Sequence, residues 1–229
     1  MYDGTIDWNA YWREGREADA DFPANVGAYG KADLLARFFE AEGVPDDFTS
    51  VGCGPADCPL ELAERFPELD VVGYDAAESV VRKNRERVES EGDDGDDETT
   101  DRENVAFGVA ALPDFDVDRQ FDLVYCYATL HYVREIERAI RNLYERVRPG
   151  GHLVFNYPNE ATREFYHDQF DDEPEFRDRF ELVFEGENVV SADEIENALG
   201  ATVHDYWDAV DADREVGAAP QNPCVYVEK

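Results

Sequence analysis

Positive charge is scarce in this sequence, in which Lys31, Lys83 and Lys229 are the only lysines. The 21 basic residues face 55 acidic ones, and the formal net charge is −34. Removal of the most acidic tract, 91–103, still leaves 47 acids against 20 bases, so the acidity is spread over the whole chain. This deficit argues against a nucleic-acid partner, because binding to a phosphate backbone depends on lysine and arginine.

A uniformly acidic surface is typical of proteins that work in concentrated salt, where self-repulsion is screened. We therefore hypothesise a cytoplasmic protein of a salt-accumulating organism. A melting temperature that falls steadily from low to molar KCl would contradict this hypothesis.

Long apolar runs are also missing, since no stretch approaches the roughly 18 apolar residues that cross a membrane. The first residues, Met1 to Gly4, have neither the basic start nor the apolar run of a signal peptide, so we expect neither export nor membrane insertion. Cysteine is sparse too. Cys53, Cys58, Cys126 and Cys224 form no CxxC pair, which argues against a zinc site and favours reduced packing residues.

Short β-branched runs alternate with longer amphipathic segments, which is typical of βαβ units and a mostly parallel sheet. Strands are expected at 48–52, 70–75, 104–109, 121–127, 152–157, 202–207 and 223–227, and helices at 8–17, 29–42, 57–66, 78–89, 134–147 and 191–199. The last two strands are joined by a loop too short for a crossover helix, so they are expected to pair antiparallel. The tract 90–103 has no apolar residue and is expected to be a solvated loop.

The most informative local motif is Ser50-Val51-Gly52-Cys53-Gly54-Pro55-Ala56-Asp57, between the first strand and its helix. Glycines at positions 52 and 54 let the backbone turn sharply and approach a ligand closely. A dinucleotide fingerprint needs a third glycine where Asp57 stands, and an acid at this helix N-terminus repels a pyrophosphate. The motif therefore favours a ligand without phosphates over a nicotinamide dinucleotide.

The second strand ends in Asp75, 23 residues past Gly52. A carboxylate at this strand end is placed to accept both ribose hydroxyls of an adenosine that lies across the strand tips. A glycine turn or a terminal aspartate is weak evidence alone. The two together, on consecutive strands, predict an adenosine site.

These segments together resemble the class I S-adenosylmethionine-dependent methyltransferases, particularly their small-molecule branch. The matching segments are 51–55, the strand that ends in Asp75, the run from Phe121 to His131, and the turn Arg148-Pro149-Gly150-Gly151. The resemblance implies a doubly wound, mostly parallel α/β sheet of seven strands in the order 3-2-1-4-5-7-6, with the last strand antiparallel. It also implies S-adenosylmethionine as cofactor and a small-molecule methyl acceptor.

The same resemblance implies roles for single residues around the cofactor. The implied cofactor-binding residues are Gly52, Cys53 and Gly54 for the methionine part, Asp75 for the ribose, Ala76, Ala110 and Ala111 beside the adenine, and Tyr127 near the sulfonium. In this sequence 109–113 lacks the acid that many members use for the adenine amine, which leaves backbone groups alone at Ala110 and Ala111.

Catalysis by methyl transfer needs little acid-base machinery, because alignment of the acceptor with the methyl group supplies most of the rate. An oxygen or protonated amine acceptor would also need a base, and His131, after the fourth strand, is the candidate, with Tyr127 as a second catalytic candidate. A purely structural role for His131, in packing or hydrogen bonding, is the alternative.

Three departures from the family pattern leave other functions open, and the first is the missing acid for the adenine amine at 109–113. Ser50 stands where the family usually has an acid, and Ala56 where it usually has a glycine. One alternative is therefore a binding or regulatory protein that kept the fold and lost the activity. A nicotinamide-dependent oxidoreductase is the second alternative, which Asp57 disfavours.

The chain is expected to form one domain, 1–229, with four parts. These are an N-terminal helical lid (1–47), a cofactor-binding core (48–157), an acidic and aromatic insertion after the fifth strand (158–187), and a C-terminal helix with a hairpin (188–229). The lid aromatics Trp8, Tyr11, Trp12 and Tyr29 fit either a cover over the site or ordinary helix packing. For Tyr166, Phe170 and Phe176 of the insertion, core packing is favoured.

Overall fold

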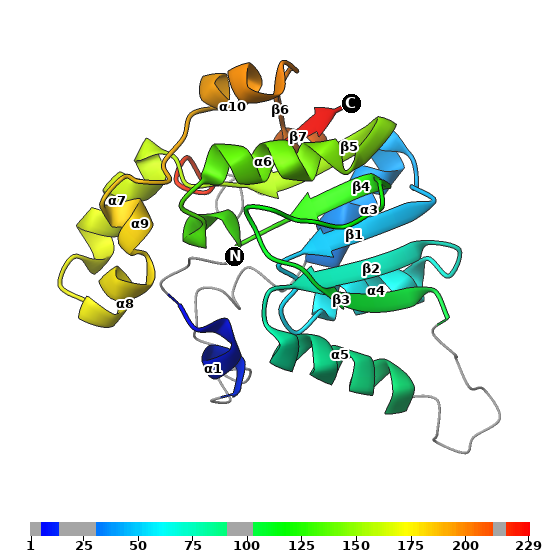
Figure 1. Cartoon of the computed structure of the whole chain (residues 1–229). Coiled ribbons are helices and arrows are strands. Elements are labelled where there is room, and N and C mark those ends of the chain that lie inside the picture. The colour runs from blue at the N-terminus through cyan, green and yellow to red at the C-terminus, as the bar shows by residue number, and fades with distance from the viewer. Residues whose placement is uncertain (1–5, 14–30, 91–102, 213–218) are drawn as a thin grey trace.

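The computed structural model describes residues 6–13, 31–90, 103–212 and 219–229, which form a seven-stranded sheet with helices around it (Figure 1). The strands are β1 (Asp47–Val51), β2 (Asp70–Asp75), β3 (Val105–Val109), β4 (Phe121–Cys126), β5 (Val147–Asn156), β6 (His204–Asp205) and β7 (Cys224–Glu228). The helices are α1 (Trp8–Arg13), α3 (Lys31–Glu42), α4 (Asp57–Arg65), α5 (Glu78–Ser90), η2 (Leu130–Tyr132), α6 (Ile136–Glu145), α7 (Glu160–Phe170), α8 (Pro174–Arg179), α9 (Glu181–Phe184), α10 (Ala192–Leu199) and α11 (Tyr206–Ala209). In these ranges no helix is long and apolar enough to span a bilayer. The predicted loop 90–103 lies, apart from its two ends, outside the described residues.

The strand order is β3-β2-β1-β4-β5-β7-β6. All neighbouring strands run parallel except the pairs that β7 forms with β5 and β6. This confirms the order and the antiparallel last strand expected from the sequence. The order reverses between β1 and β4, and in open α/β sheets a ligand binds at such a switch point, outside the carboxyl ends of the strands.

An apolar core lies on each face of the sheet. One core contains Leu35 of α3 and Leu62 of α4, and the other contains Ile140 of α6 and Ile195 of α10. Successive residues of a strand point to opposite faces, and in β4 Leu123 joins the first core while Val124 joins the second. The central strands are therefore buried on both sides and hold their carboxyl ends in fixed positions.

The segment 202–207 departs from the predicted strand. Only His204 and Asp205 pair with β7, and the chain then turns into the short helix α11. The Asp205 side chain accepts a hydrogen bond from the backbone N–H of Asp208 at 2.9 Å, which starts the helix as an N-cap. The predicted strand 202–207 is therefore wrong beyond Asp205, because Tyr206 and Trp207 are buried in the first core as residues of this helix.

β5 begins at Val147, five residues before the predicted start, and α6 ends at Glu145. The pairing with β4 jumps from Phe121 opposite Val147 to Leu123 opposite His152, so a bulge absorbs the turn residues 148–151. The predicted turn is therefore part of a longer, interrupted strand.

The insertion 158–187 folds into the three short helices α7, α8 and α9. Phe176, Phe180 and Phe184 are buried together, and Tyr132, Tyr166 and Phe170 pack around them; we call these six residues the aromatic cluster. The packing interpretation of the insertion aromatics is therefore confirmed. Because Tyr132 belongs to η2, the cluster also connects the insertion to the loop after β4.

Candidate active site

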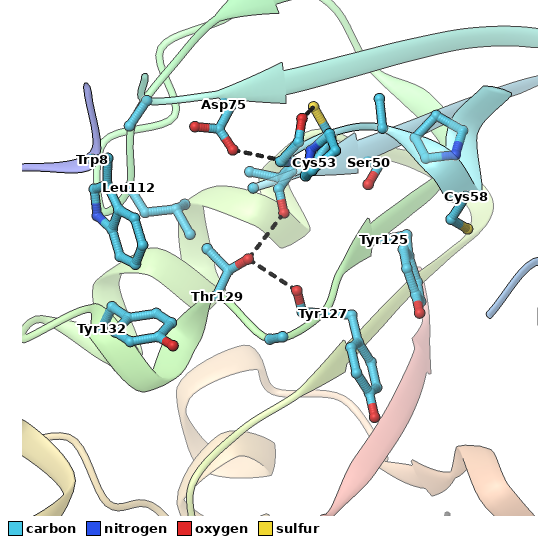
Figure 2. A pocket seen from close by; sticks show the side chains of 18 of the residues that line it. Trp8, Ser50, Cys53, Cys58, Asp75, Leu112, Tyr125, Tyr127, Thr129 and Tyr132 are labelled. Carbon is cyan, nitrogen blue, oxygen red and sulfur yellow. Dashed lines mark hydrogen bonds between the residues drawn. The ribbon is translucent and has the colours of Figure 1, made fainter. Parts of the chain in front are cut away.

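A cavity lies at the carboxyl ends of β1, β2 and β4, where the fold predicts a ligand (Figure 2). Among the predicted cofactor-binding residues, those that line it are Gly52, Cys53, Gly54, Asp75, Ala76, Ala110 and Tyr127. Ala111 is not among the lining residues, although its neighbours Ala110 and Leu112 are. The structure thus brings most of the predicted cofactor residues to one wall.

In the turn after β1, neither Gly52 nor Gly54 has room for a side chain. Gly52 has φ +71°, and a Cβ there would lie 2.1 Å from Oγ1 of Thr129. Gly54 has φ +52°, and its Cβ would lie 3.2 Å from the ring of Trp12. Left-handed backbone and crowding both require glycine, so the turn presents bare backbone to the cavity.

Asp75 joins the tips of β1 and β2 (Figure 2). Its Oδ2 accepts a hydrogen bond from the backbone N–H of Gly54, and its Oδ1 accepts one from Ala77, both at 2.9 Å. Burial raises the pKa of the Asp75 carboxyl, and the backbone N–H bonds act in the opposite direction. A carboxylate has about four lone-pair sites, so Asp75 keeps capacity for ligand hydroxyls.

Asn84 of α5 also holds Gly54 in place, and sequence reasoning missed this residue. Its side-chain amide donates to the carbonyl oxygen of Gly54 at 2.8 Å, and it is buried. Gly54 is therefore fixed through both its N–H and its carbonyl. A lone asparagine in an amphipathic helix gives no local signal of this role.

Asp57 is the first residue of α4, at the helix end where a dinucleotide would place its pyrophosphate. Both terminal nitrogens of Arg87 lie 3.2 Å from its Oδ1. The side chains of Arg87 and Asp57 are 44% and 65% exposed, so water and salt screen the pair. A carboxylate therefore lies at this end of the cavity, as the sequence predicted, and it would oppose a phosphate at the helix N-terminus.

Lys31, the first residue of α3, is a lining residue that sequence reasoning missed. Its ammonium lies 4.3 Å from the centre of the Tyr127 ring, and its electrostatic neighbours are the thiols of Cys58 and Cys224. Burial lowers the pKa of Lys31 to about 8. A half-buried lysine whose ammonium faces a ring and two thiols is well placed to bind an anionic ligand group.

Tyr127 lines the same part of the wall. Its ring stacks on Tyr125 at 6.0 Å, and its hydroxyl accepts a hydrogen bond from the Asn222 side chain at 3.3 Å. Burial raises the pKa of Tyr127 to about 12, so the phenol stays protonated near neutral pH. The structure therefore supports Tyr127 as a surface for the ligand and does not support it as a base.

His131 lies in η2 and is not among the lining residues. It is buried, its Nδ1 has no hydrogen-bond partner, and burial lowers its pKa to about 4. Asn188 holds the backbone here by donating to the carbonyl oxygens of Leu130 and His131, at 3.1 and 2.9 Å. The His131 ring lies 6.5 Å from the ring of Phe180 and is not part of the cavity wall, so this geometry favours the packing alternative, and the catalytic role stays a prediction.

Helix α1 contributes Trp8, Tyr11 and Trp12 to the cavity wall. On one side, Asn9 accepts a hydrogen bond from the backbone N–H of Ser79 at the start of α5, at 3.0 Å. On the other side, the ring of Trp8 meets Tyr132 edge-on at 4.8 Å. These contacts hold α1 against the start of α5 and against η2, while its three aromatic rings line the cavity. Tyr29, the fourth predicted lid aromatic, lies outside the described residues.

Fold and cavity together define a class: doubly wound α/β proteins that bind a ligand at the switch point of the sheet. Residues 50–153 match the family described as a methyltransferase domain. Trans-aconitate 2-methyltransferase of Variovorax paradoxus is 31% identical over 157 residues, which cover 67% of this chain and 51% of that protein. Malonyl-[acyl-carrier protein] O-methyltransferase of Priestia megaterium is 23% identical over 58% of this chain and 43% of that protein. The chain spans about half the length of these curated relatives or less.

Solved structures show the same fold. The N-methyltransferase NodS of Bradyrhizobium japonicum, in complex with S-adenosylhomocysteine, aligns with a TM-score of 0.57 and 16% identity over 98% of this chain and 97% of its own. The plantazolicin methyltransferase BpumL, also in complex with S-adenosylhomocysteine, aligns with a TM-score of 0.62 and 10% identity over 95% of this chain and 90% of its own. Residues 50–153 are thus similar to a methyltransferase-domain family, and the chain has the fold of the class I methyltransferases, in agreement with the predicted resemblance.

Proposed function

We propose that this chain transfers the methyl group of S-adenosylmethionine to a small-molecule acceptor. The observation that carries the proposal is the pairing of Asp75 with the bare backbone of Gly52 and Gly54 at one cavity wall. This arrangement offers a carboxylate to a ribose and bare backbone to a ligand segment without phosphates, with Asp57 in the phosphate position. Relatives named for trans-aconitate and malonyl-[acyl-carrier protein] support a small or carrier-bound acceptor.

The lining groups fit the parts of this cofactor. Asp75 would accept the ribose hydroxyls, and the apolar side chains of Ala76, Ala110 and Leu112 would flank the adenine. Lys31 would bind the carboxylate of the methionine part, because it supplies a positive charge at the cavity wall. This contact would anchor the amino-acid end of the cofactor, where Ser50 replaces the acid that the family usually has.

The bound cofactor supplies an electrophilic methyl group on a sulfonium, which transfers by in-line displacement. The protein aligns the acceptor and keeps water away, and these two effects supply the rate. Trp8 and Trp12 of α1, with Tyr132 of η2, form an aromatic wall of the cavity that serves the second purpose.

Calorimetric titration in molar KCl tests the proposal with S-adenosylhomocysteine, S-adenosylmethionine and NADH as ligands. We expect saturable binding of the first two and no heat from NADH. Binding of NADH in place of the sulfur compounds would overturn the proposal in favour of the oxidoreductase alternative. Tight binding of S-adenosylmethionine without transfer to any small-molecule pool would favour the non-catalytic alternative.

A further inference from the structure

The loop after β4 has a strained backbone where it lines the cavity. Ala128 has φ +53°, a left-handed conformation that residues with a Cβ rarely adopt. Among the described residues, four that are not glycine have such a φ, and two of them, Ala56 and Ala128, line the cavity. Strain of this kind persists only where surrounding contacts hold it, and it is concentrated at functional sites. The contacts that hold Ala128 therefore bear on how the cavity binds its ligand.

Asn156, the last residue of β5, holds Ala128 in place. Its side-chain oxygen accepts a hydrogen bond from the backbone N–H of Ala128 at 2.7 Å. The residue is 3% exposed, and its strand lies between β4 and β7, where Asn156 pairs with Cys224. It is not among the residues that line the cavity, so it can act on a ligand only through the loop.

Thr129 holds the same loop at a second point (Figure 2). Its hydroxyl donates to the carbonyl oxygen of Tyr127 at 3.0 Å, and the hydroxyl oxygen lies 3.5 Å from the carbonyl oxygen of Val51 at the end of β1. The peptide group between Tyr127 and Ala128 is thus held by its carbonyl and by its N–H. Thr129 also fills the space beside Gly52. The orientation of this peptide is therefore coupled to the glycine turn, which would hold the cofactor.

The bond from Ala128 to Asn156 does more than satisfy a buried donor. Ala128 is only partly buried and borders the cavity, so in a relaxed loop its N–H could donate to water. Asn156, in contrast, is buried, and a buried amide is costly unless it is hydrogen-bonded. The bond therefore selects the left-handed conformation of the loop.

We propose that Asn156 is a positioning residue for the cofactor, because it holds Ala128 in the left-handed conformation in which loop 127–129 contacts the bound cofactor beside the glycine turn. This inference rests on the proposed function and extends it to a residue behind the cavity wall. Without the bond the strain at Ala128 is released, and the loop leaves the conformation that binds. The apparent affinity then falls in proportion to the fraction of molecules that keep this conformation.

The test measures binding of S-adenosylhomocysteine to the full chain by calorimetry in molar KCl, together with the melting temperature of every variant. Asn156→Leu removes the acceptor at similar volume, and Asn156→Ser, whose shorter side chain does not reach Ala128, takes its place if Asn156→Leu does not fold. Ala128→Gly, alone and combined with the Asn156 variant, allows the left-handed φ without strain.

Asn104→Leu is the matched control. The half-buried Asn104 donates to the carbonyl oxygens of Ala63 and Leu69, both at 3.1 Å, so its loss also removes hydrogen bonds between a side-chain amide and the backbone. It precedes β3, at the amino ends of the parallel strands, and does not line the cavity.

We expect the Kd to rise about 5- to 30-fold in the Asn156 variant, which corresponds to the strain of about 1–2 kcal/mol in a left-handed alanine. Ala128→Gly alone should bind like the wild type, and its addition to the Asn156 variant should restore most of the lost affinity. Asn104→Leu should lower the melting temperature and keep the Kd within about twofold of the wild type.

Three results would overturn the inference: an unchanged Kd in the folded Asn156 variant, an equal rise in Asn104→Leu, or no restoration by Ala128→Gly. Each of these leaves the proposed function standing. Absent binding of S-adenosylhomocysteine in the wild type would overturn the proposed function itself, and the inference with it.

Discussion

Replacement of Gly52 by alanine tests the contact that joins the turn after β1 to the loop after β4. An alanine there would keep the left-handed φ of +71° and place its Cβ 2.1 Å from Oγ1, 2.6 Å from Cγ2 and 2.9 Å from Cβ of Thr129. Thr129 cannot easily yield, because its hydroxyl donates to the carbonyl oxygen of Tyr127 at 3.0 Å. One of the two loops must therefore move.

The expected loss has two parts. The left-handed conformation costs an alanine about 1–2 kcal/mol, and overpacking adds about 1–3 kcal/mol, so Gly52→Ala should lose about 2–5 kcal/mol. Gly200→Ala isolates the first part, because Gly200 has φ +65° and no atom lies within 4 Å of the point that its Cβ would occupy. At about 2–4 °C per kcal/mol for a chain of this size, the melting temperature should fall by about 4–20 °C in Gly52→Ala and by about 2–8 °C in Gly200→Ala.

Thermal unfolding followed by circular dichroism, with all variants at one KCl concentration, measures these losses. Thr129→Ala added to Gly52→Ala removes the contacts at 2.1 and 2.6 Å and should restore part of the stability in a double-mutant cycle. Equal losses in Gly52→Ala and Gly200→Ala, or no restoration by Thr129→Ala, would refute the reasoning.

Two further predictions concern pH. Burial lowers the pKa of His131 to about 4 in the folded protein, below its ordinary value of about 6.5. Between these two pH values the unfolded chain binds a proton at this residue and the folded chain does not. The free energy of unfolding should therefore fall as the pH falls from 6.5 to 4, by at most about 1.4 kcal/mol per pH unit. The replacement His131→Leu should remove this fall, which urea unfolding of both proteins over this pH range measures. The same pH dependence in both proteins would contradict the prediction. For Lys31, whose pKa is about 8, the affinity for S-adenosylhomocysteine should fall as pH rises above 8, because the carboxylate prefers the protonated ammonium. Calorimetry at pH 7 and 9 should show a smaller change of this affinity with pH in Lys31→Met than in the wild type. An identical change in both proteins would exclude the proposed contact.

The sequence predicts the framework of the site because its signals are local. Glycines at 52 and 54 lie beside a strand end, and Asp75 ends the next strand, so the spacing alone places them at one edge of a parallel sheet. The structure confirms the strand order and places these residues on one cavity wall.

The residues that sequence reasoning missed act through contacts between distant parts of the chain. Lys31 precedes the glycine turn by about twenty residues, and Arg179 follows β5 in the insertion, yet both line the same cavity. Nothing in a local pattern distinguishes a lysine or arginine that faces a cavity from one on the surface.

Non-local pairing also explains the errors in the strands. The start of β5 at Val147 depends on a bulge against β4, and the helix at Tyr206 depends on the Asp205 cap and on burial in the first core. The strand propensity of a residue reflects how well it fits a half-buried pleated surface. It does not predict where a bulge or a helix cap interrupts a strand.

The central claim is that Asp75 and the glycine turn form an adenosine site without a phosphate seat. Calorimetric titration of S-adenosylhomocysteine into Asp75→Asn tests it most directly, with Asp116→Asn, an exposed aspartate, as the matched control and the melting temperature as a check of folding. The account predicts a loss of affinity of about 10- to 100-fold or more in folded Asp75→Asn, the range for a charged hydrogen-bond partner, and wild-type affinity in Asp116→Asn. Wild-type affinity in a folded Asp75→Asn protein would contradict it.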